Sequence, residues 1–131
     1  MAVRISFDSE SLEANISKML GRKFKIDDYD GIDTEIAGSY AMHIARYVPY
    51  KTGKLLHSAS VGDGKITYSA KVRRKNGIYD YAGIQYLVPF PQESRSTPGT
   101  YDHWNRHLTT AERKAFYEDV AKLVIERMNN G

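Results

Sequence analysis

Pro49 separates two stretches of sequence whose apolar residues repeat with different periods. Before it, Ile36, Tyr40 and Ile44 recur at the spacing of one helix face, which predicts a helix from Asp33 or Thr34 to about Tyr47. A proline cannot continue a helix and drives the preceding residue toward extended geometry. The helix must therefore end before Pro49, and the residues beyond must form a different structure.

The segment that follows, VPYKTGKLLHSASV at residues 48–61, contains Thr-Gly-Lys and superficially resembles a phosphate-binding loop. That loop needs a glycine where this chain has Val48, and a hydroxyl after the lysine where it has Leu55. A nucleotide site is therefore excluded. We expect Thr52 to cap a short turn that runs through Gly53 to Leu56, with Leu55 directed toward the core.

The remaining pattern mixes strands and helices without a regular βαβ alternation. A strand is predicted at 2–7. Asp8 or Ser9 is expected to cap a helix that Gly21 ends, because Leu12, Ile16, Met19 and Leu20 recur at helical spacing. Strands at 57–61 and 65–73 flank the hairpin turn 62–64, and 78–88 suits a strand or a strand plus one turn. Residues 89–103 read as a long loop, and a capping box at Thr109–Glu112 starts the last helix.

These elements predict an α+β fold over residues 1–131, a single domain with a small, mainly antiparallel sheet. The long central helix and the C-terminal helix would pack on one face of that sheet. Loop 89–103 would be an extended interaction loop, because long loops in compact domains commonly carry contacts.

Composition limits the classes of function. The chain has no cysteine, which excludes disulfides and thiolate metal sites, and it has neither a long apolar run nor a signal-peptide pattern, so we expect an intracellular protein without membrane contact. Its formal charge is only +3, but the charges are segregated. Residues 71–75, KVRRK, are basic and residues 27–35, DDYDGIDTE, are acidic, so copies of the chain could pair with one another.

Two possible metal motifs are incomplete. The acidic stretch lacks the first and last ligands of a calcium loop, since Ile26 and Ala37 occupy those positions. His103 and His107 have the spacing of zinc ligands on a helix, but Trp104 replaces the glutamate of the metalloprotease motif and no third ligand is evident. We therefore expect no cofactor, no metal and no catalytic group. We expect Trp104 to anchor its segment instead.

The order of the motifs resembles the tail-completion or minor capsid proteins of tailed bacteriophages. In that family a helix is followed by a turn with Pro, Thr-Gly, Leu and Ser at fixed places, then by a Tyr-Ala and Gln-Tyr segment, and then by a Thr-Pro-Gly-Thr and Trp stretch. The matching turn residues here are Val48, Pro49, Thr52, Gly53, Leu55 and Ser58. The later matches are Tyr81, Ala82, Gln85, Tyr86, Thr97 to Thr100 and Trp104.

The resemblance implies a non-enzymatic structural protein of the virion, made in the host cytoplasm. It would form a homo-oligomeric ring of six or twelve subunits in the neck, between the portal or head-completion proteins and the tail-terminator or tail-tube proteins. The interface candidates are Tyr81, Gln85, Tyr86, Phe90, Arg95 and Trp104. Residues that could face DNA or an acidic protein surface are Lys71, Arg73, Arg74 and Lys75.

Two other classes of function remain open. A small basic RNase-like protein would use His57, His103, or Arg73 with Arg74, and the isolated monomer would cleave RNA. A stand-alone DNA-binding protein would bind duplex DNA tightly as a monomer, with a steep dependence on salt.

Overall fold

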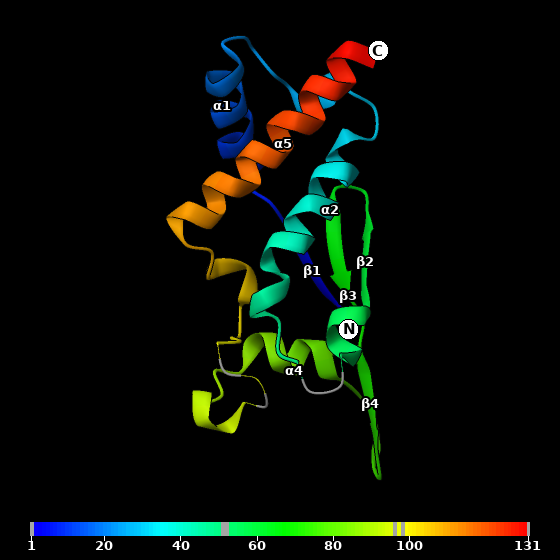
Figure 1. Cartoon of the computed structure of the whole chain (residues 1–131). Helices are drawn as coiled ribbons and strands as arrows, with labels where there is room; N and C mark the ends of the chain where they lie inside the picture. The colour runs from blue at the N-terminus through cyan, green and yellow to red at the C-terminus, as the bar shows by residue number, and fades with distance from the viewer. Residues whose placement is uncertain (1, 51–52, 96, 98, 131) are drawn as a thin grey trace. The chain divides into compact units, whose positions relative to one another are not determined.

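The computed structural model describes residues 2–50, 53–95, 97 and 99–130 (Figure 1). Its α-helices are α1 (Ser9–Leu20), α2 (Ile32–Ile44), α3 (Lys54–His57), α4 (Tyr81–Leu87) and α5 (Thr110–Asn130). Its strands are β1 (Val3–Ser6), β2 (Ala59–Gly62), β3 (Lys65–Tyr68), β4 (Lys71–Arg74) and β5 (Gly77–Asp80). Short 3₁₀ helices lie at Ile26–Asp28, Ala45–Tyr47, Gln92–Ser94 and Trp104–Arg106. Helices and small sheets occur together, which confirms the predicted α+β class.

The chain divides into two compact units, each built from separate stretches of sequence. Unit 1 comprises Met1–Ile5, Ile44–Ser60 and Ile66–His107, and unit 2 comprises Ser6–His43, Val61–Lys65 and Leu108–Gly131. A three-stranded sheet has the strand order β1-β3-β2, and a separate two-stranded sheet pairs β4 with β5.

In unit 2, helices α1, α2 and α5 lie side by side (Figure 1). The Asp8 side chain caps α1 by accepting a hydrogen bond from the Ser11 amide, and Gly21 ends the helix in the left-handed conformation, both as predicted. Leu12 and Ile16 are buried, but Met19 is 47% exposed. Met19 lies in the last turn, where the chain leaves the helix at Gly21.

Helix α2 begins at Ile32, one residue before the earlier of the two predicted caps. Ile32 is completely buried, so it forms part of the packed face of the helix. The Asp33 carboxylate lies in the first turn and accepts a hydrogen bond from the Thr34 amide at 2.8 Å. The α-helix ends at Ile44, and a 3₁₀ turn continues to Tyr47 before Pro49. Ile36, Tyr40 and Ile44 are buried, which confirms the predicted inner face of this helix.

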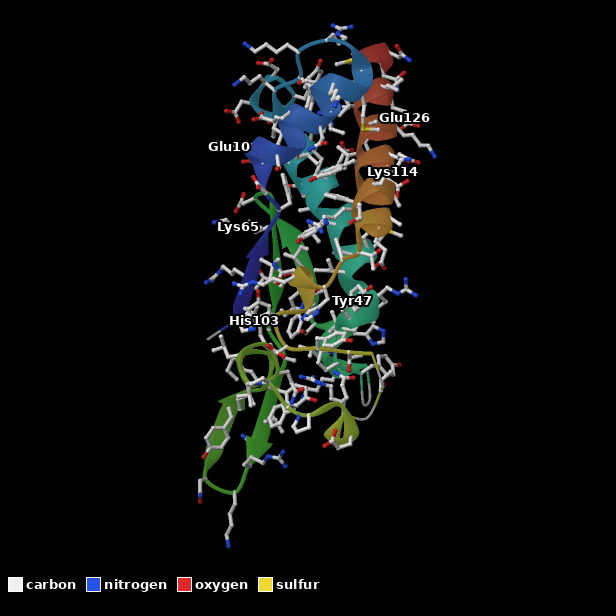
Figure 2. The ribbon with its side chains drawn as sticks, turned by 90° about the vertical axis from the view of Figure 1, so that its left-hand side faces the viewer. Glu10, Tyr47, Lys65, His103, Lys114 and Glu126 are labelled. Carbon is white, nitrogen blue, oxygen red and sulfur yellow. The ribbon has the colours of Figure 1, made fainter. Side chains whose placement is uncertain are left out.

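Helix α5 is joined to α2 by contacts spread over several turns. The Tyr40 and Phe116 rings lie 5.1 Å apart, His43 Nε2 lies 2.7 Å from Asp119 Oδ2, and Arg127 Nη1 donates to Glu35 Oε2 at 2.8 Å. Exposed charged residues lie on the outer faces of α1 and α5, as Glu10, Lys114 and Glu126 illustrate (Figure 2). Unit 2 is therefore a small helical layer with an apolar interior.

In unit 1, the predicted strand 65–73 is interrupted after Tyr68, and its second half pairs in the other sheet. Hydrogen bonds to residues distant in the sequence account for the interruption. The Ser69 amide donates to Ser58 Oγ at 3.2 Å, and the Ala70 carbonyl accepts from the Ala82 amide at 3.1 Å. Both groups therefore bond outside any strand ladder. Ile66, Tyr68 and Ala70 are nevertheless all buried, whereas Val72 beyond the break is partly exposed.

Candidate interaction surface

The hairpin of β4 and β5 in unit 1 is mostly exposed and is here called the arm (residues 71–80). Its register pairs Lys71 with Asp80, Val72 with Tyr79, Arg73 with Ile78 and Arg74 with Gly77. Side chains of directly opposed residues lie on the same face of an antiparallel pair. One face therefore carries Arg73 beside Ile78, and the other carries Val72 beside Tyr79.

The arm is strongly basic, and its cations have no partner within the described part of the chain. Lys71, Arg73, Arg74 and Lys75 are its basic residues, and Asp80 is its single acid. Among the described residues, no carboxylate forms an ion pair with any of the four cations. The structure thus leaves these sequence-predicted residues exposed on a projecting ribbon, which Figure 1 shows extending beyond α4 within unit 1.

Exposed apolar side chains continue from the arm into the next elements. More than half of the large apolar residues that the structure exposes lie between positions 78 and 90, and we call these the apolar band. Its members are Ile78, Tyr79, Ile84, Leu87, Val88 and Phe90. Ile78 and Leu87 are the most exposed, at 61% and 65%. A two-stranded hairpin with apolar residues on exposed faces is marginally stable alone, and concentrated exposed apolar surface is typical of protein contacts.

Helix α4 fixes the position of the apolar band relative to the arm. Asp80 ends β5 and caps α4, with Oδ1 accepting from the Gly83 amide at 3.0 Å. Ala82 is completely buried, and its amide bond to the Ala70 carbonyl ties the helix to the start of β4. The sequence predicted a strand, or a strand plus one turn, at 78–88. The buried Ala82 and the Asp80 cap account for the longer helix.

Loop 89–103 is tied to the rest of unit 1 at several points. Gln92 closes it on itself, since Nε2 donates to the Thr100 carbonyl at 2.8 Å and Oε1 accepts from the Gly99 amide at 3.0 Å. The Thr97 hydroxyl donates to the Tyr50 carbonyl, and the Tyr101 amide donates to the Tyr47 carbonyl. These contacts place the predicted Thr97 to Thr100 stretch against the turn that follows α2, although Ser96 and Pro98 lie outside the described residues.

Arg95 is buried in this loop, with only 4% of its side chain exposed. Its Nη2 lies 3.7 Å from Asp102 Oδ1, while Nε and Nη1 have no hydrogen-bond partner among the described residues. The other Asp102 oxygen lies 2.8 Å from His103 Nδ1. This hydrogen bond from His103, with a smaller contribution from Arg95, lowers the pKa of Asp102 below its usual 3.8.

The His103 backbone is held in an uncommon conformation. Its φ is +42°, its amide donates to the Tyr86 carbonyl at 2.9 Å, and its ring lies 4.6 Å from the Tyr86 ring. The Tyr86 hydroxyl donates to Asn105 Oδ1 at 2.6 Å, and burial raises the pKa of Tyr86 above 10.0. Tyr86 therefore connects α4 to the segment around Trp104.

The predicted interface residues fall into two groups. Tyr81, Gln85 and Tyr86 on α4 are partly exposed, and Phe90 is exposed. The Arg95 side chain and Trp104 are buried, and Trp104 has no exposed surface at all. Trp104 is therefore a core residue and cannot contact a partner directly, which corrects its assignment as an interface residue. Its large apolar ring packs edge-on against Tyr68 and Tyr86.

The turn after Pro49 is held in place by local packing and hydrogen bonds. Gly53 begins α3 with φ +82°, and a Cβ there would lie 3.0 Å from the Tyr50 hydroxyl. Leu55 is buried, and Ser58 donates to the Leu55 carbonyl at 2.7 Å while accepting from Ser69. The expected cap, Thr52, lies outside the described residues, and Gly53 occupies the capping position of α3.

The histidines do not form a metal site within the described residues. His103 and His107 lie on either side of the 3₁₀ turn Trp104–Arg106 instead of on one α-helix, and His107 stacks on Tyr101 at 4.0 Å. The described residues contain no group of three potential metal-ligating side chains. His57 is exposed, and His43 pairs with Asp119.

A second charged surface lies in unit 2. A hollow of about 270 Å³ is lined by Glu13, Asp27, Asp33 and Asp63 together with Ser6 and Ser9, and we call it the acidic hollow. Glu13 accepts from the Ile26 amide at 2.8 Å, but no basic side chain in the described part of the chain pairs with these four carboxylates.

Comparisons with protein-family models, with curated proteins and with solved structures found no match. No helix in the described part of the chain combines the length and apolar character needed to cross a membrane.

Sequence reasoning missed two features of this surface. It did not identify the apolar band as a unit, although Ile84, Leu87 and Val88 stand close together in the sequence; a helix start at Asp80 would have revealed which of them face outward. It also treated Arg95 as a loop residue available to a partner. A single arginine in a polar loop gives no sequence signal of burial.

Proposed function

We propose that this protein is a structural virion protein of a tailed phage that forms a ring in the neck, between the capsid portal complex and the tail tube. The observation that carries the proposal is the ordered set of motifs from Pro49 through the Tyr81–Tyr86 segment to Trp104. The arrangement of unit 1 is compatible with this role, because unit 1 presents an exposed hairpin arm and an exposed apolar band that a neighbouring subunit could contact.

A connector of this kind acts through shape and charge. Each subunit would contact its neighbours through two different surfaces. When the rotation that relates successive subunits closes on itself, the result is a ring, which has six or twelve copies in this proposal. The apolar band supplies apolar surface that can be buried between subunits. The cations of the arm supply a long-range attraction that orients an approaching subunit. Clustered cations in an assembled ring could also contact DNA that passes through the lumen.

The test is the structure of particles made without this protein. Electron microscopy of such particles should show filled heads and finished tails that remain separate, and supplying the protein should restore joining. Particles of normal appearance would remove the proposal.

One observation favours a second candidate, an RNase-like acid–base activity. His103 Nδ1 is paired with the Asp102 carboxylate at 2.8 Å, which is the geometry that orients a histidine as a general base. Among the described contacts, however, no hydrogen bond or ion pair links His103 to His57, Arg73 or Arg74. This candidate predicts RNA cleavage by the purified subunit that disappears in His103→Ala, whereas a connector shows no turnover with either protein.

A further inference from the structure

We propose that the arm of one subunit docks in the acidic hollow of a second copy of this chain. The inference rests on the proposed ring and specifies which two surfaces make its repeating contact. Both surfaces are charged and opposite in sign, and neither forms an ion pair between its charged side chains and other described residues.

The first step in the argument is the exposure of the arm. Arg73, Arg74 and Lys75 lie toward the turn of the hairpin. The apolar residues Ile78 and Tyr79 lie on opposite faces of the arm. A ribbon of only two strands buries little surface of its own, so contact with another surface would stabilise it. Docking would cover its apolar side chains and pair its cations at the same time.

The second step is the complementarity of the hollow. Glu13, Asp27, Asp33 and Asp63 surround a space of about 270 Å³, with Ser6 and Ser9 supplying further polar groups at its wall. The planar guanidinium of arginine binds carboxylates with two parallel hydrogen bonds, so the arginines of the arm suit such a lining. A second copy is the occupant that we infer because this chain carries both members of the charged pair.

The third step concerns geometry. The arm belongs to unit 1 and the acidic hollow to unit 2, so the two surfaces are distinct patches on one chain. A contact between different patches is heterologous, and its repetition produces rings or filaments instead of isolated dimers. The proposed contact therefore has the symmetry that a ring requires.

Charge reversal tests the contact. Sedimentation velocity at low salt should show concentration-dependent self-association of the wild-type subunit. Arg73→Glu with Arg74→Glu should weaken it by about a hundredfold or more, because each lost close charge pair is worth about tenfold or more. The control is Lys114→Glu with Lys122→Glu, which makes the same change in net charge at exposed positions on α5 and should assemble as the wild type does.

Complementation makes the test specific. Asp27→Lys with Asp63→Asn should also impair self-association, and an equimolar mixture with the arm variant should restore association of the two variants, because the unaltered arm of one then meets the unaltered acidic hollow of the other. Circular dichroism on each variant separates a lost contact from a lost fold. Restoration by mixing also requires that both variants are folded.

Disulfide capture locates the contact without altering most of its charge. The chain has no cysteine, so a Lys75→Cys subunit mixed with an Asp27→Cys subunit should form a crosslinked dimer on oxidation, at least about tenfold faster than Lys114→Cys mixed with Asp27→Cys. Equal rates for the two mixtures would overturn the proposal.

Other outcomes are equally decisive. A wild-type subunit that remains monomeric and gives no selective crosslink contradicts the contact, and so does an arm variant that assembles normally. If that variant assembles normally but loses binding to duplex DNA, the arm faces DNA instead. In either case separate heads and tails in particles lacking the protein would still support the neck function, so the two proposals can fail independently.

Discussion

The Trp104 and Tyr86 rings form a T-shaped pair, with ring centroids 4.8 Å apart and an interplanar angle of 86°. The pair joins α4 to the segment that follows loop 89–103, and the geometry is one that aromatic rings favour. Stability of unit 1 should therefore depend on the only tryptophan of the chain.

Replacing Trp104 should be among the most destabilising single changes. Trp104→Ala should reduce the free energy of unfolding by about 3 to 5 kcal/mol, because it empties a fully buried site. Trp104→Phe should cost less, since a ring remains and the indole N–H, which has no partner among the described residues, is removed. Urea denaturation followed by circular dichroism measures both, and equal losses for the two variants would contradict this account.

Gly53 should resist substitution where Gly62 does not. Gly53→Ala places a Cβ 3.0 Å from the Tyr50 hydroxyl on a backbone with φ +82°, which should cost about 1 to 2 kcal/mol or more. Gly62→Ala meets no atom within 4 Å and serves as the control. Thermal unfolding of the two variants compares them directly, and a similar melting temperature for both would show that this turn can relax.

Stability should fall in acid partly through Asp102. Its pKa is lowered in the folded chain relative to 3.8, so its stabilising contribution is present above 3.8 and is lost as pH falls through the folded value. The wild type should therefore be more stable than Asp102→Asn at neutral pH, and the difference should shrink below pH 3.8. Urea midpoints across this range measure the effect, with the exposed Asp28→Asn as control. A difference that is independent of pH would exclude a contribution from the charge.

The start of α5 should depend on one hydroxyl. Thr109 Oγ1 accepts from the Glu112 amide at 3.1 Å, and Glu112 Oε1 accepts from the Thr109 amide at 3.0 Å. Thr109→Ala should cost about 1 kcal/mol, whereas Thr110→Ala, one residue further along, should have little effect. Chemical denaturation distinguishes them, and equal losses would mean that the reciprocal cap contributes nothing specific.

The sequence predicted features whose cause is local and missed those decided by distant parts of the chain. The Asp8 cap, the Gly21 end of α1 and the Thr109–Glu112 capping box all depend on residues within one turn, and all are present. The interruption after Tyr68 depends on Ser58 and Ala82, which lie more than ten residues away on either side. Alternation of apolar residues could not reveal it, because Ile66, Tyr68 and Ala70 stay buried across the break.

The candidate surface was predicted unevenly for the same reason. The basic residues of the arm stand together in the sequence, so their shared location was foreseeable. Burial of Arg95 and Trp104 arises from the closure of loop 89–103 on Gln92 and from the packing of Tyr86. Those are tertiary contacts, and the local sequence around an arginine or a tryptophan does not encode them.

The discontinuous composition of the two units also bears on how the protein emerges from the ribosome. All residues of unit 1 have been synthesised once His107 has been added, whereas unit 2 needs Leu108–Gly131 to supply α5. Until then α5 is absent, so the apolar faces of α1 and α2, which include Ile16 and Tyr40, stay uncovered in the nascent chain. Folding during translation should therefore complete unit 1 before the last helix closes unit 2.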